Sequence, residues 1–479
     1  MNVIGREKEV KRLKKIFNSK KPELVVIKGR RRVGKTFLIQ NIFENDFIFS
    51  HTGLSPAELD ESDASKLTQQ LEYFYLSLLR YGYKGKKKIT TWSQAFFELE
   101  KLIDNKKTKK RQVIFIDELP WLDTPKSSFI AGFSNFWNNY ASKKSNLMVI
   151  VCGSSNSWMD DVFFNSYGGF YRRATQEIKL APFDLKETKE LLASNNVFCS
   201  DYEIIRTYMI FGGMPFYLNQ IDSDYSLGVN IDNLFFGKEA ILNNEFDLLF
   251  NSTVKRADDA KKIIRFLSKK RIGFTKEEIS EAVSISDGGG LTNILKSLIS
   301  SDIIMKYSPI NEKKNVNYYK LIDPFCLFYL KFVENNNSLD PTFWQDHQFS
   351  HSFISYAGFA FENLAFYHLD KIKEALGVAA VTSELSSLVV NNEDRGAQID
   401  LIIIRKDNVV DSCEIKFYNE QFVLEKDYLE NLRNKDGVLS SKLRKRQIIE
   451  HVLISPYGIK KNMYSNYFQK VVTLEDLFR

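Results

Sequence analysis

Residues 29–36 read Gly-Arg-Arg-Arg-Val-Gly-Lys-Thr, which fits the pattern G-x-x-x-x-G-K-[ST] at every fixed position. The stretch follows the apolar run of Glu23–Lys28, and Phe37–Phe43 continues after it with helical spacing. A strand, a glycine-containing loop and a helix in this order are the context that the pattern requires. The glycines let the backbone curl so that several N–H groups point at a phosphate, and the helix dipole adds to the attraction. The stretch therefore predicts a phosphate-binding loop at the edge of a parallel α/β sheet.

The chemistry of this loop predicts ATP and Mg²⁺ as its ligands. We expect Lys35 to reach the β- and γ-phosphates, and the hydroxyl of Thr36 to ligate Mg²⁺. The three arginines leave three interpretations open, namely phosphate contacts, sensing of a neighbouring domain, and exposed loop charge. The expected nucleotide-binding residues of this region are Gly29, Arg30, Arg31, Arg32, Val33, Gly34, Lys35, Thr36 and Phe37.

An acidic pair follows a second buried run. Val113–Ile116 is entirely apolar, and Asp117 and Glu118 come directly after it. Ligands bind outside the carboxyl ends of the strands in open parallel sheets, so Asp117 is expected to hold the water shell of the Mg²⁺ ion. Glu118 is expected to orient the attacking water as a general base. The alternative is an ordinary strand that ends in a solvated acidic turn. The two motifs support each other, however, because a phosphate-binding loop needs a carboxylate beside its metal ion, and this carboxylate has that role only beside such a loop.

Two further pairs of polar residues are candidates for the same reaction. The run Leu147–Cys152 is followed by Gly153, Ser154 and Ser155, and one of these serines could hydrogen-bond the γ-phosphate or the water. A plain Gly-Ser turn is the alternative. Arg172 and Arg173 could supply an arginine finger, in cis or from a neighbouring subunit. A surface pair at a helix end is equally compatible with the sequence.

Four motifs follow one another along the chain: Ile4-Gly5-Arg6-Glu7 with Glu9, the loop Gly29–Thr36, Phe115–Glu118, and Gly212-Gly213-Met214-Pro215. In this order they resemble the archaeal-type ATPases, a family in the STAND branch of AAA+ proteins. The resemblance covers about residues 1–330. It implies that Gly5 and Arg6, together with Gly213 and Pro215, line the adenine side of the nucleotide, and that a winged helix follows the ATPase. No sensor arginine is assigned, because a Gly-x-Pro element takes that place in this branch.

Residues 256–335 have the pattern of a winged helix, with three helices followed by a hairpin. Leu291–Ser300 would be the recognition helix, and Lys296 is its single cation. The wing loop Asn311–Asn315 adds Lys313 and Lys314. DNA binding is compatible with this pattern, but winged helices also serve as packing modules, so both interpretations stay open. The expected elements are helices at Ala260–Leu267, Thr275–Val283 and Leu291–Ser300, and strands at Ile303–Tyr307 and Asn317–Leu321.

The C-terminal part suggests a second chemistry on a β-hairpin. The runs Gln398–Ile404 and Val409–Phe417 flank a polar turn, so residues whose numbers sum to about 814 should face each other. Asp400 then lies opposite Glu414, and Lys416 lies on the same face. Opposed carboxylates repel each other unless a divalent metal ion lies between them.

We therefore expect Asp400 and Glu414 to be metal ligands, with a third oxygen from Glu362 on the helix Phe359–Ala375. Lys416 would position a water and stabilise negative charge as it develops.

This arrangement resembles the PD-(D/E)xK nuclease fold, over about residues 350–479. Ile399 stands where the motif usually has proline. A nuclease-like fold without catalysis, and an unrelated fold, are the alternatives. The basic run Lys442–Arg446 could follow a phosphate backbone or form a solvated helix face.

Composition limits the class of protein. The 479 residues are 44% hydrophobic, which excludes a disordered chain, and the net charge of +7 is a weak signal for a polyanionic partner. We find no N-terminal signal core and no run of about 18 uncharged apolar residues, so a cytoplasmic protein without a membrane span is expected. The four cysteines have no metal-ligand spacing and indicate reduced thiols.

Together these patterns predict an α/β chain that hydrolyses ATP and thereby controls a nuclease-like domain, for which metal-dependent cutting of DNA is one interpretation. The alternatives are a non-cutting signalling ATPase and a DNA-binding regulator switched by ATP. DNA and a second copy of the chain are the candidate partners. The expected domains are a P-loop ATPase core (1–180), a helical lid (181–255), a winged helix (256–335) and a restriction-endonuclease-like α/β domain (350–479).

Overall fold

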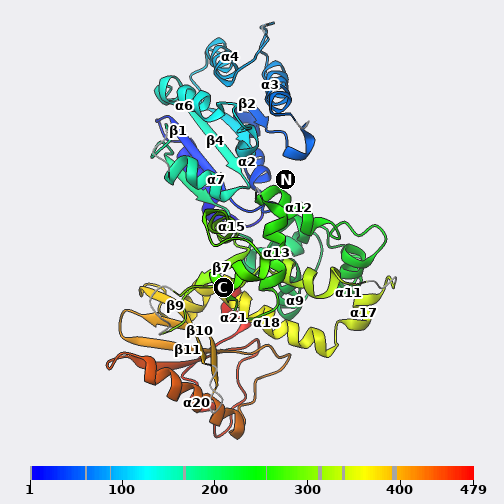
Figure 1. The fold of residues 1–479 in the computed structure, drawn as a ribbon, viewed down its shortest axis with the longest axis vertical. Coiled ribbons are helices and arrows are strands. Elements are labelled where there is room, and N and C mark those ends of the chain that lie inside the picture. Colours follow the sequence, from blue (N-terminus) through cyan, green and yellow to red (C-terminus); the bar gives the residue numbers. More distant parts are fainter. Residues whose placement is uncertain are drawn as a thin grey trace. The chain divides into compact units, whose positions relative to one another are not determined.

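The computed structural model describes residues 3–59, 62–86, 88–165, 169–254, 256–310, 316–336, 340–390 and 396–479. The chain forms two compact units, Met1–Ala181 with Asn251–Lys255, and Pro182–Phe250 with Arg256–Arg479 (Figure 1). The finer division into four domains stays a prediction. Within the described ranges, no helix is long and apolar enough to cross a membrane.

The first unit is built on a five-stranded sheet with the order β2-β3-β4-β1-β5, in which every neighbouring pair is parallel. This confirms the predicted parallel sheet. The edge strands β2 and β5 were not predicted. The strands are β1 (Glu23–Lys28), β2 (Phe47–Thr52), β3 (Gln112–Asp117), β4 (Leu147–Gly153) and β5 (Gln176–Lys179). The helices are α1 (Glu7–Phe17), α2 (Lys35–Phe43), α3 (Asp63–Arg80), α4 (Trp92–Asn105), α5 (Leu119–Leu122), α6 (Phe129–Asn139) and α7 (Asn156–Asp160).

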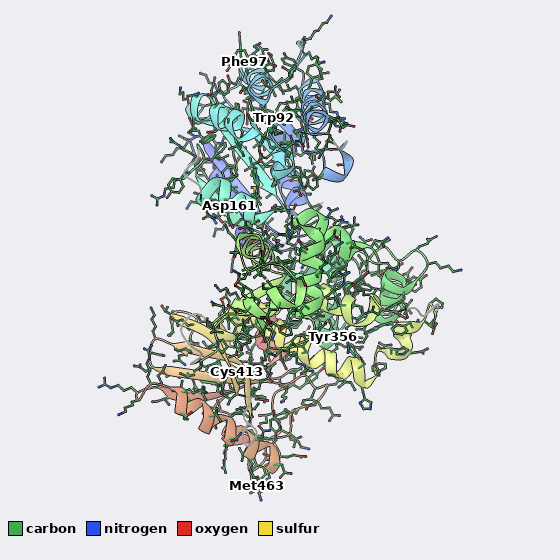
Figure 2. The ribbon with its side chains drawn as sticks, in the orientation of Figure 1. Trp92, Phe97, Asp161, Tyr356, Cys413 and Met463 are labelled. Atoms are coloured by element: carbon green, nitrogen blue, oxygen red, sulfur yellow. The ribbon has the colours of Figure 1, made fainter. Side chains whose placement is uncertain are left out.

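Both faces of the parallel sheet are buried. Leu24 and Val26 of β1 pack into a core with aromatic residues of α3, α4 and α6, while Val25 and Ile27 alternate to the other face and are equally inaccessible. Figure 2 labels Trp92, which is buried in this core, and Phe97, whose side chain lies on the exposed side of α4. A sheet that is covered on both faces reads as continuous apolar runs, which is why β1, β3 and β4 were visible in the sequence.

The second unit contains two sheets and most of the helices. One sheet has the order β6-β8-β7, and the other has the order β13-β12-β11-β10-β9. Its strands are β6 (Phe274–Thr275), β7 (Ile304–Tyr307), β8 (Tyr318–Leu321), β9 (Ser383–Val390), β10 (Ala397–Arg405), β11 (Val409–Ile415), β12 (Ile448–Ile454) and β13 (Lys470–Val472). Its helices begin with α8 (Leu185–Ser194), α9 (Asp201–Phe211), α10 (Pro215–Leu218) and α11 (Leu227–Ile231), and α12 (Glu245–Thr253) runs into the first unit. The remaining helices are α13 (Ala257–Leu267), α14 (Lys276–Val283), α15 (Gly289–Ser300), α16 (Pro324–Phe328), α17 (Phe343–His347), α18 (His351–Tyr367), α19 (Leu369–Ala375), α20 (Lys426–Lys442) and α21 (Leu474–Phe478).

The helices and hairpin expected at residues 256–335 are present as α13, α14, α15, β7 and β8, but the winged-helix assignment itself stays a prediction. Leu291, Ile294, Leu295 and Leu298 of α15 are buried, as expected for its core face. The predicted wing loop Asn311–Asn315, with Lys313 and Lys314, lies outside the described residues.

One predicted helix is wrong in its limits. The sequence suggested a single helix at Phe359–Ala375, whereas the chain forms α18 from His351 and then α19, with His368 between them. His368 has non-helical backbone angles, φ −106° and ψ 25°, and separates the two helices. Its imidazole is buried, and Nε2 accepts a hydrogen bond from the backbone N–H of Leu185 at 3.1 Å. Its Nδ1 contacts the carbonyl of Leu364 at 3.0 Å.

This histidine predicts acid sensitivity of the second unit. Burial lowers the pKa of His368 below its ordinary value of 6.5, so the unfolded imidazole takes up a proton at a pH where the folded one stays neutral. Since the unfolded state then binds more protons, stability falls as the pH drops below 6.5. The melting temperature of the second unit should therefore decline between pH 7 and pH 5, and less steeply in His368→Gln. The exposed His351→Gln is the matched control; an unchanged slope in His368→Gln would contradict the assignment.

Candidate functional site

The predicted phosphate loop connects β1 to α2 in the first unit. Gly34 and Arg32 have left-handed backbones, with φ of 91° and 72°, which is the curled geometry that turns successive N–H groups to one side. A Cβ at Gly29 would lie 2.6 Å from the carbonyl oxygen of Leu180, so only glycine fits there. The loop therefore has the shape of an anion cradle at the start of a helix.

Lys35 lies over this loop rather than out in solvent. Its side chain is buried, and Nζ donates to the carbonyl oxygens of Gly29 at 2.8 Å and Arg30 at 3.1 Å. Arg6 approaches from the other side, with its guanidinium 3.3 Å from the carbonyl of Val33. The structure thus places the Gly5-Arg6 motif beside the phosphate loop. Among the other loop residues, Arg30 is buried, Arg31 and Arg32 are half-buried, and Phe37 is exposed.

The metal-binding pair predicted from the sequence is in contact. Thr36 Oγ1 donates to Asp117 Oδ2 at 2.6 Å. Burial raises the pKa of Asp117, and the charge of Glu118 raises it further. A hydroxyl and a carboxylate oxygen at this separation suit Mg²⁺, which prefers oxygen ligands, so the residues fit the ion. Thr36 and Asp117 would hold it, and the bound ion would neutralise charge on the phosphates.

The strand that bears Asp117, β3, is not the direct neighbour of β1, the strand that leads into the phosphate loop. β4 lies between β1 and β3. The loop and the first turn of α2 therefore extend across the carboxyl edge of β4, because Thr36 still reaches Asp117. Ser154 follows β4 and accordingly lies between the two motifs.

Glu118 is held by this intervening strand. Its Oε2 accepts from the backbone N–H of Ser154 at 3.1 Å and from the Ser154 hydroxyl at 2.8 Å. Glu118 itself has a left-handed backbone, with φ of 45°. The sequence left Ser154 and Ser155 open, and the structure brings Ser154 to the carboxylate. This contact fixes the direction of the carboxylate at the sheet edge where a water would be oriented.

The other candidates are an arginine pair in the first unit and the glycine–proline element in the second. Arg172 and Arg173 are exposed, and the Arg172 guanidinium lies 5.2 Å from the ring centre of Tyr171. Gly213 and Pro215 belong to the second unit, where a Cβ at Gly213 would lie 1.9 Å from the carbonyl oxygen of Phe183. Their place on the adenine side stays a prediction.

Sequence reasoning missed the ion pairs at Lys28, the last residue of β1. Its Nζ lies 2.5 Å from Glu177 of β5 and also pairs with Asp160 of α7. These contacts anchor the strand end from which the phosphate loop departs. No motif marks them, because the two carboxylates are more than a hundred residues away in sequence.

The C-terminal hairpin has the predicted register. Leu401 lies opposite Cys413 and Ile402 opposite Ser412, so the pairing continues toward Asp400 and Glu414. Lys416 Nζ lies 3.0 Å from Glu414. The sequence also suggested Glu362 on the preceding helix, and its carboxylate is close enough to Asp400 for the two charges to repel.

Glu414 has two partners that were not predicted, a lysine and a tyrosine hydroxyl. Lys435 of α20 lies 2.9 Å from its Oε2, and the hydroxyl of Tyr428 donates to Oε1. Burial by itself would raise the pKa of Glu414, but Lys435 and Lys416 hold it below its ordinary value. In the described part of the chain, no group of three or more His, Cys, Asp or Glu side chains is arranged to hold a metal ion. Glu362, Asp400 and Glu414 are therefore not gathered around one point in this arrangement, and their role as metal ligands stays a prediction.

Glu362 is the most perturbed carboxyl of this cluster. It is 8% exposed, and its Oε2 has no hydrogen-bond partner among the described residues. Burial raises its pKa to about 7, and the charge of Asp400 adds to the rise. Lys320 of β8, itself buried with its ammonium 4.9 Å from the ring centre of Phe366, opposes the rise. We call Glu362, Asp400, Glu414, Lys416 and Lys320 the C-terminal charge cluster.

Comparison with known proteins identifies the first site. Residues 4–221 match the family model described as an ATPase domain predominantly from Archaea. An uncharacterized protein of Methanocaldococcus jannaschii is 25% identical over 370 residues, which are 76% of this chain and 76% of that protein. An uncharacterized ATP-binding protein of the same organism is 43% identical over 42 residues, which are 9% of this chain and 71% of that protein.

Solved structures with a similar chain path include a Walker-type ATPase of Pyrococcus abyssi, at 18% identity and a TM-score of 0.48, covering 69% of this chain and 96% of that one. A STAND protein of Pyrococcus horikoshii with a tetratricopeptide repeat sensor has 17% identity and a TM-score of 0.29, covering 79% of this chain and 52% of that one. The family match, together with the geometry of the phosphate loop, shows that the chain contains an ATPase domain of the archaeal type.

Proposed function

We propose that this ATPase controls the C-terminal domain, which acts as a nuclease-like module on DNA, with ATP hydrolysis as the switch. The observation that carries the proposal is that Lys416 pairs with Glu414, and that Asp400 and Lys416 lie near enough to Glu362 to shift its pKa, beside the paired strands β10 and β11. Two acids and a lysine on paired strands, with a third acid from a preceding helix, are the residue types that PD-(D/E)xK nucleases use. The inference that the ATPase domain acts as the switch and the C-terminal domain as its output rests on analogy with the family.

The site of the first unit supports the ATP-hydrolysis part of the proposal. Lys35 and the loop amides would bind the phosphates, and Thr36 with Asp117 would hold the ion. Glu118, fixed by Ser154, would orient the water and accept its proton. Arg172 and Arg173 remain proposed as fingers, and a finger supplied by a neighbouring subunit would require a homo-oligomer.

DNA would be the partner of the second unit. α13, α14 and α15 with the hairpin β7–β8 have the order of a winged helix, and Lys296 lies on the exposed side of α15. The basic run Lys442–Arg446 follows α20, and Arg444, Lys445 and Arg446 are exposed there. Exposed cations on two separate elements would suit the phosphate backbone of a nucleic acid.

A second function, in which the C-terminal domain binds without cutting, is favoured by one observation. Both carboxylate oxygens of Glu414 are already occupied, by Lys416 and Tyr428 on one side and Lys435 on the other. A charge cluster that is internally neutralised in this way can serve structure alone. Cutting would require Glu414 to exchange Lys435 and Tyr428 for a metal ion.

Nicking of supercoiled plasmid DNA by the full chain separates the two functions. With Mg²⁺ or Mn²⁺ and ATP, we expect nicked product from the wild type, and only background product from Asp400→Ala and Lys416→Ala. Asp407→Ala is the matched control, because Asp407 lies at the turn of the same hairpin and pairs with Arg405. Absence of nicking by the wild type with ATP, ADP and a non-hydrolysable analogue would overturn the cutting function and leave the non-cutting one.

A further inference from the structure

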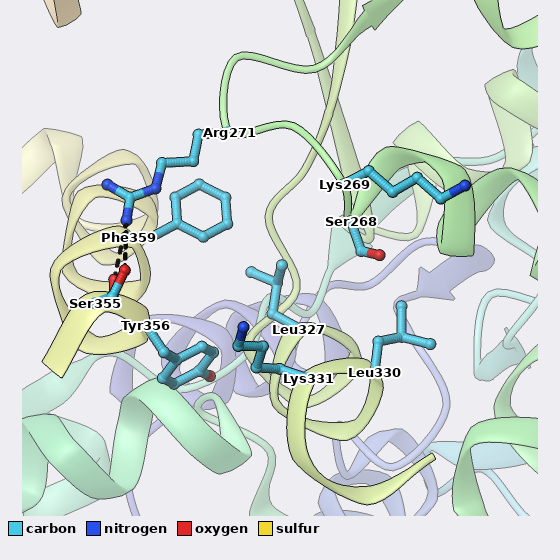
Figure 3. A pocket seen from close by; sticks show the side chains of 9 residues that line it. All are labelled: Ser268, Lys269, Arg271, Leu327, Leu330, Lys331, Ser355, Tyr356 and Phe359. Carbon is cyan, nitrogen blue, oxygen red and sulfur yellow. Dashed lines mark hydrogen bonds between the residues drawn. The ribbon is translucent and has the colours of Figure 1, made fainter. Parts of the chain in front are cut away.

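A cavity of about 230 Å³ opens in the second unit beside α18 (Figure 3). Three segments line it: the turn after α13, the helical stretch around Leu327–Lys331, and the N-terminal half of α18. At roughly 30 Å³ for each water in the liquid, the space holds several waters or one small polyatomic ion. All its lining residues belong to the second unit, whereas the phosphate loop belongs to the first.

The polar lining of this cavity is cationic. Lys269, Arg271 and Lys331 line it, and no carboxylate does. Among the described residues, no Asp or Glu lies within ion-pair distance of Lys269 or Lys331. The three residues are exposed at the surface, and cations that line one concave space together attract an anion.

Arg271 is held in place before any ligand arrives. Its Nη2 donates to the carbonyl oxygen and to the hydroxyl of Ser355, each at 3.1 Å. The guanidinium also lies 5.6 Å from the ring centre of Phe359. Figure 3 shows these two hydrogen bonds, with the ring of Phe359 beside the guanidinium. A guanidinium fixed in this way loses little conformational freedom when it binds an anion.

The remaining lining selects the class of anion. Tyr356 offers only its ring, because its hydroxyl donates to the carbonyl of Met209 at 2.6 Å. Ser268 and Ser355 add hydroxyls, and Leu327 and Phe359 add apolar surface. Charged N–H donors clearly outnumber acceptors, which suits a group with several anionic oxygens and more than one negative charge.

We propose that this cavity binds the phosphate group of a phosphate ester. Two sources share that chemistry, a nucleic-acid strand and a free nucleotide. Arg271 Nη1 also lies 3.9 Å from Glu362 of the C-terminal charge cluster, so a bound phosphate and Glu362 would compete for the same guanidinium. Phosphate binding itself does not depend on the proposed cutting of DNA.

The test uses the full chain with Lys35→Ala, so that the phosphate loop of the first unit contributes no binding. Inorganic phosphate should raise the melting temperature of this parent, since a ligand that binds only the folded state stabilises it. Lys331→Ala or Lys269→Ala should remove most of that rise. Lys262→Ala is the matched control, because its side chain is 61% exposed on α13 and lies outside the cavity.

A fluorescein-labelled single-stranded oligonucleotide identifies the source. If a strand occupies the cavity, Lys331→Ala should weaken its binding about tenfold, as expected for one charge-assisted contact. The slope of the logarithm of affinity against the logarithm of salt concentration should fall by about 0.7. Loss of the phosphate effect with unchanged oligonucleotide binding supports a free nucleotide. A phosphate-induced rise of equal size in the parent, Lys269→Ala and Lys331→Ala overturns the proposal.

Discussion

Glu118→Gln should lower the turnover number of ATP hydrolysis by about 10²- to 10⁴-fold while nucleotide binding is retained. The amide keeps the size of the side chain and can still accept from Ser154, whose hydroxyl lies 2.8 Å from Glu118 Oε2. It cannot take a proton from water, so only the chemical step is lost. Steady-state phosphate release and binding of a fluorescent ATP analogue measure the two effects separately.

In contrast to Glu118→Gln, Lys35→Ala should lose nucleotide binding as well as turnover, because the ammonium of Lys35 is the cation held over the phosphate loop. Glu44→Gln is the control, since Glu44 is an exposed glutamate that follows α2. Turnover of Glu118→Gln within twofold of the wild type would remove Glu118 from the reaction. Absence of phosphate release from the wild type would instead favour a regulator that is switched by ATP occupancy alone.

Glu414→Gln should lower the free energy of unfolding of the second unit by about 3–5 kcal/mol, the usual cost of removing one partner from a buried ion pair. Glu414 is the anion shared by Lys416 at 3.0 Å and Lys435 at 2.9 Å, and all three side chains are largely buried. Without its charge, both lysines lose the carboxylate that they share. Chemical denaturation followed by circular dichroism measures the loss.

Two variants sharpen this result. Glu414→Gln combined with Lys435→Met removes a cation together with the anion, so it should recover part of the lost stability. Glu430→Gln replaces an exposed glutamate of α20 and should change stability by less than about 0.5 kcal/mol. Equal stability of Glu414→Gln and Glu430→Gln would show that the cluster does not contribute to the fold.

The motifs that the sequence revealed are those whose parts are adjacent in the chain. The loop at 29–36 and the pair Asp117–Glu118 each follow a buried strand, and a buried strand in a covered parallel sheet is a plain apolar run. The edge strands β2 and β5 were not predicted from the sequence, because Phe47–Thr52 contains polar residues and Gln176–Lys179 is short and mostly polar. The register of β10 and β11 was predictable because one short turn fixes a hairpin pairing.

The sequence by itself determined the chemistry of the ATPase domain. The order of its motifs, and the strand or helix periodicity of the residues around them, can be read along the chain. Only the tertiary structure decided which partners each group has. It placed β4 between the two ATPase motifs and brought Ser154 to Glu118. It also brought Lys435 to Glu414, and Arg271 to both Ser355 and Glu362. These pairs join elements far apart in the chain, and packing and burial, which no short stretch of sequence encodes, set their distances.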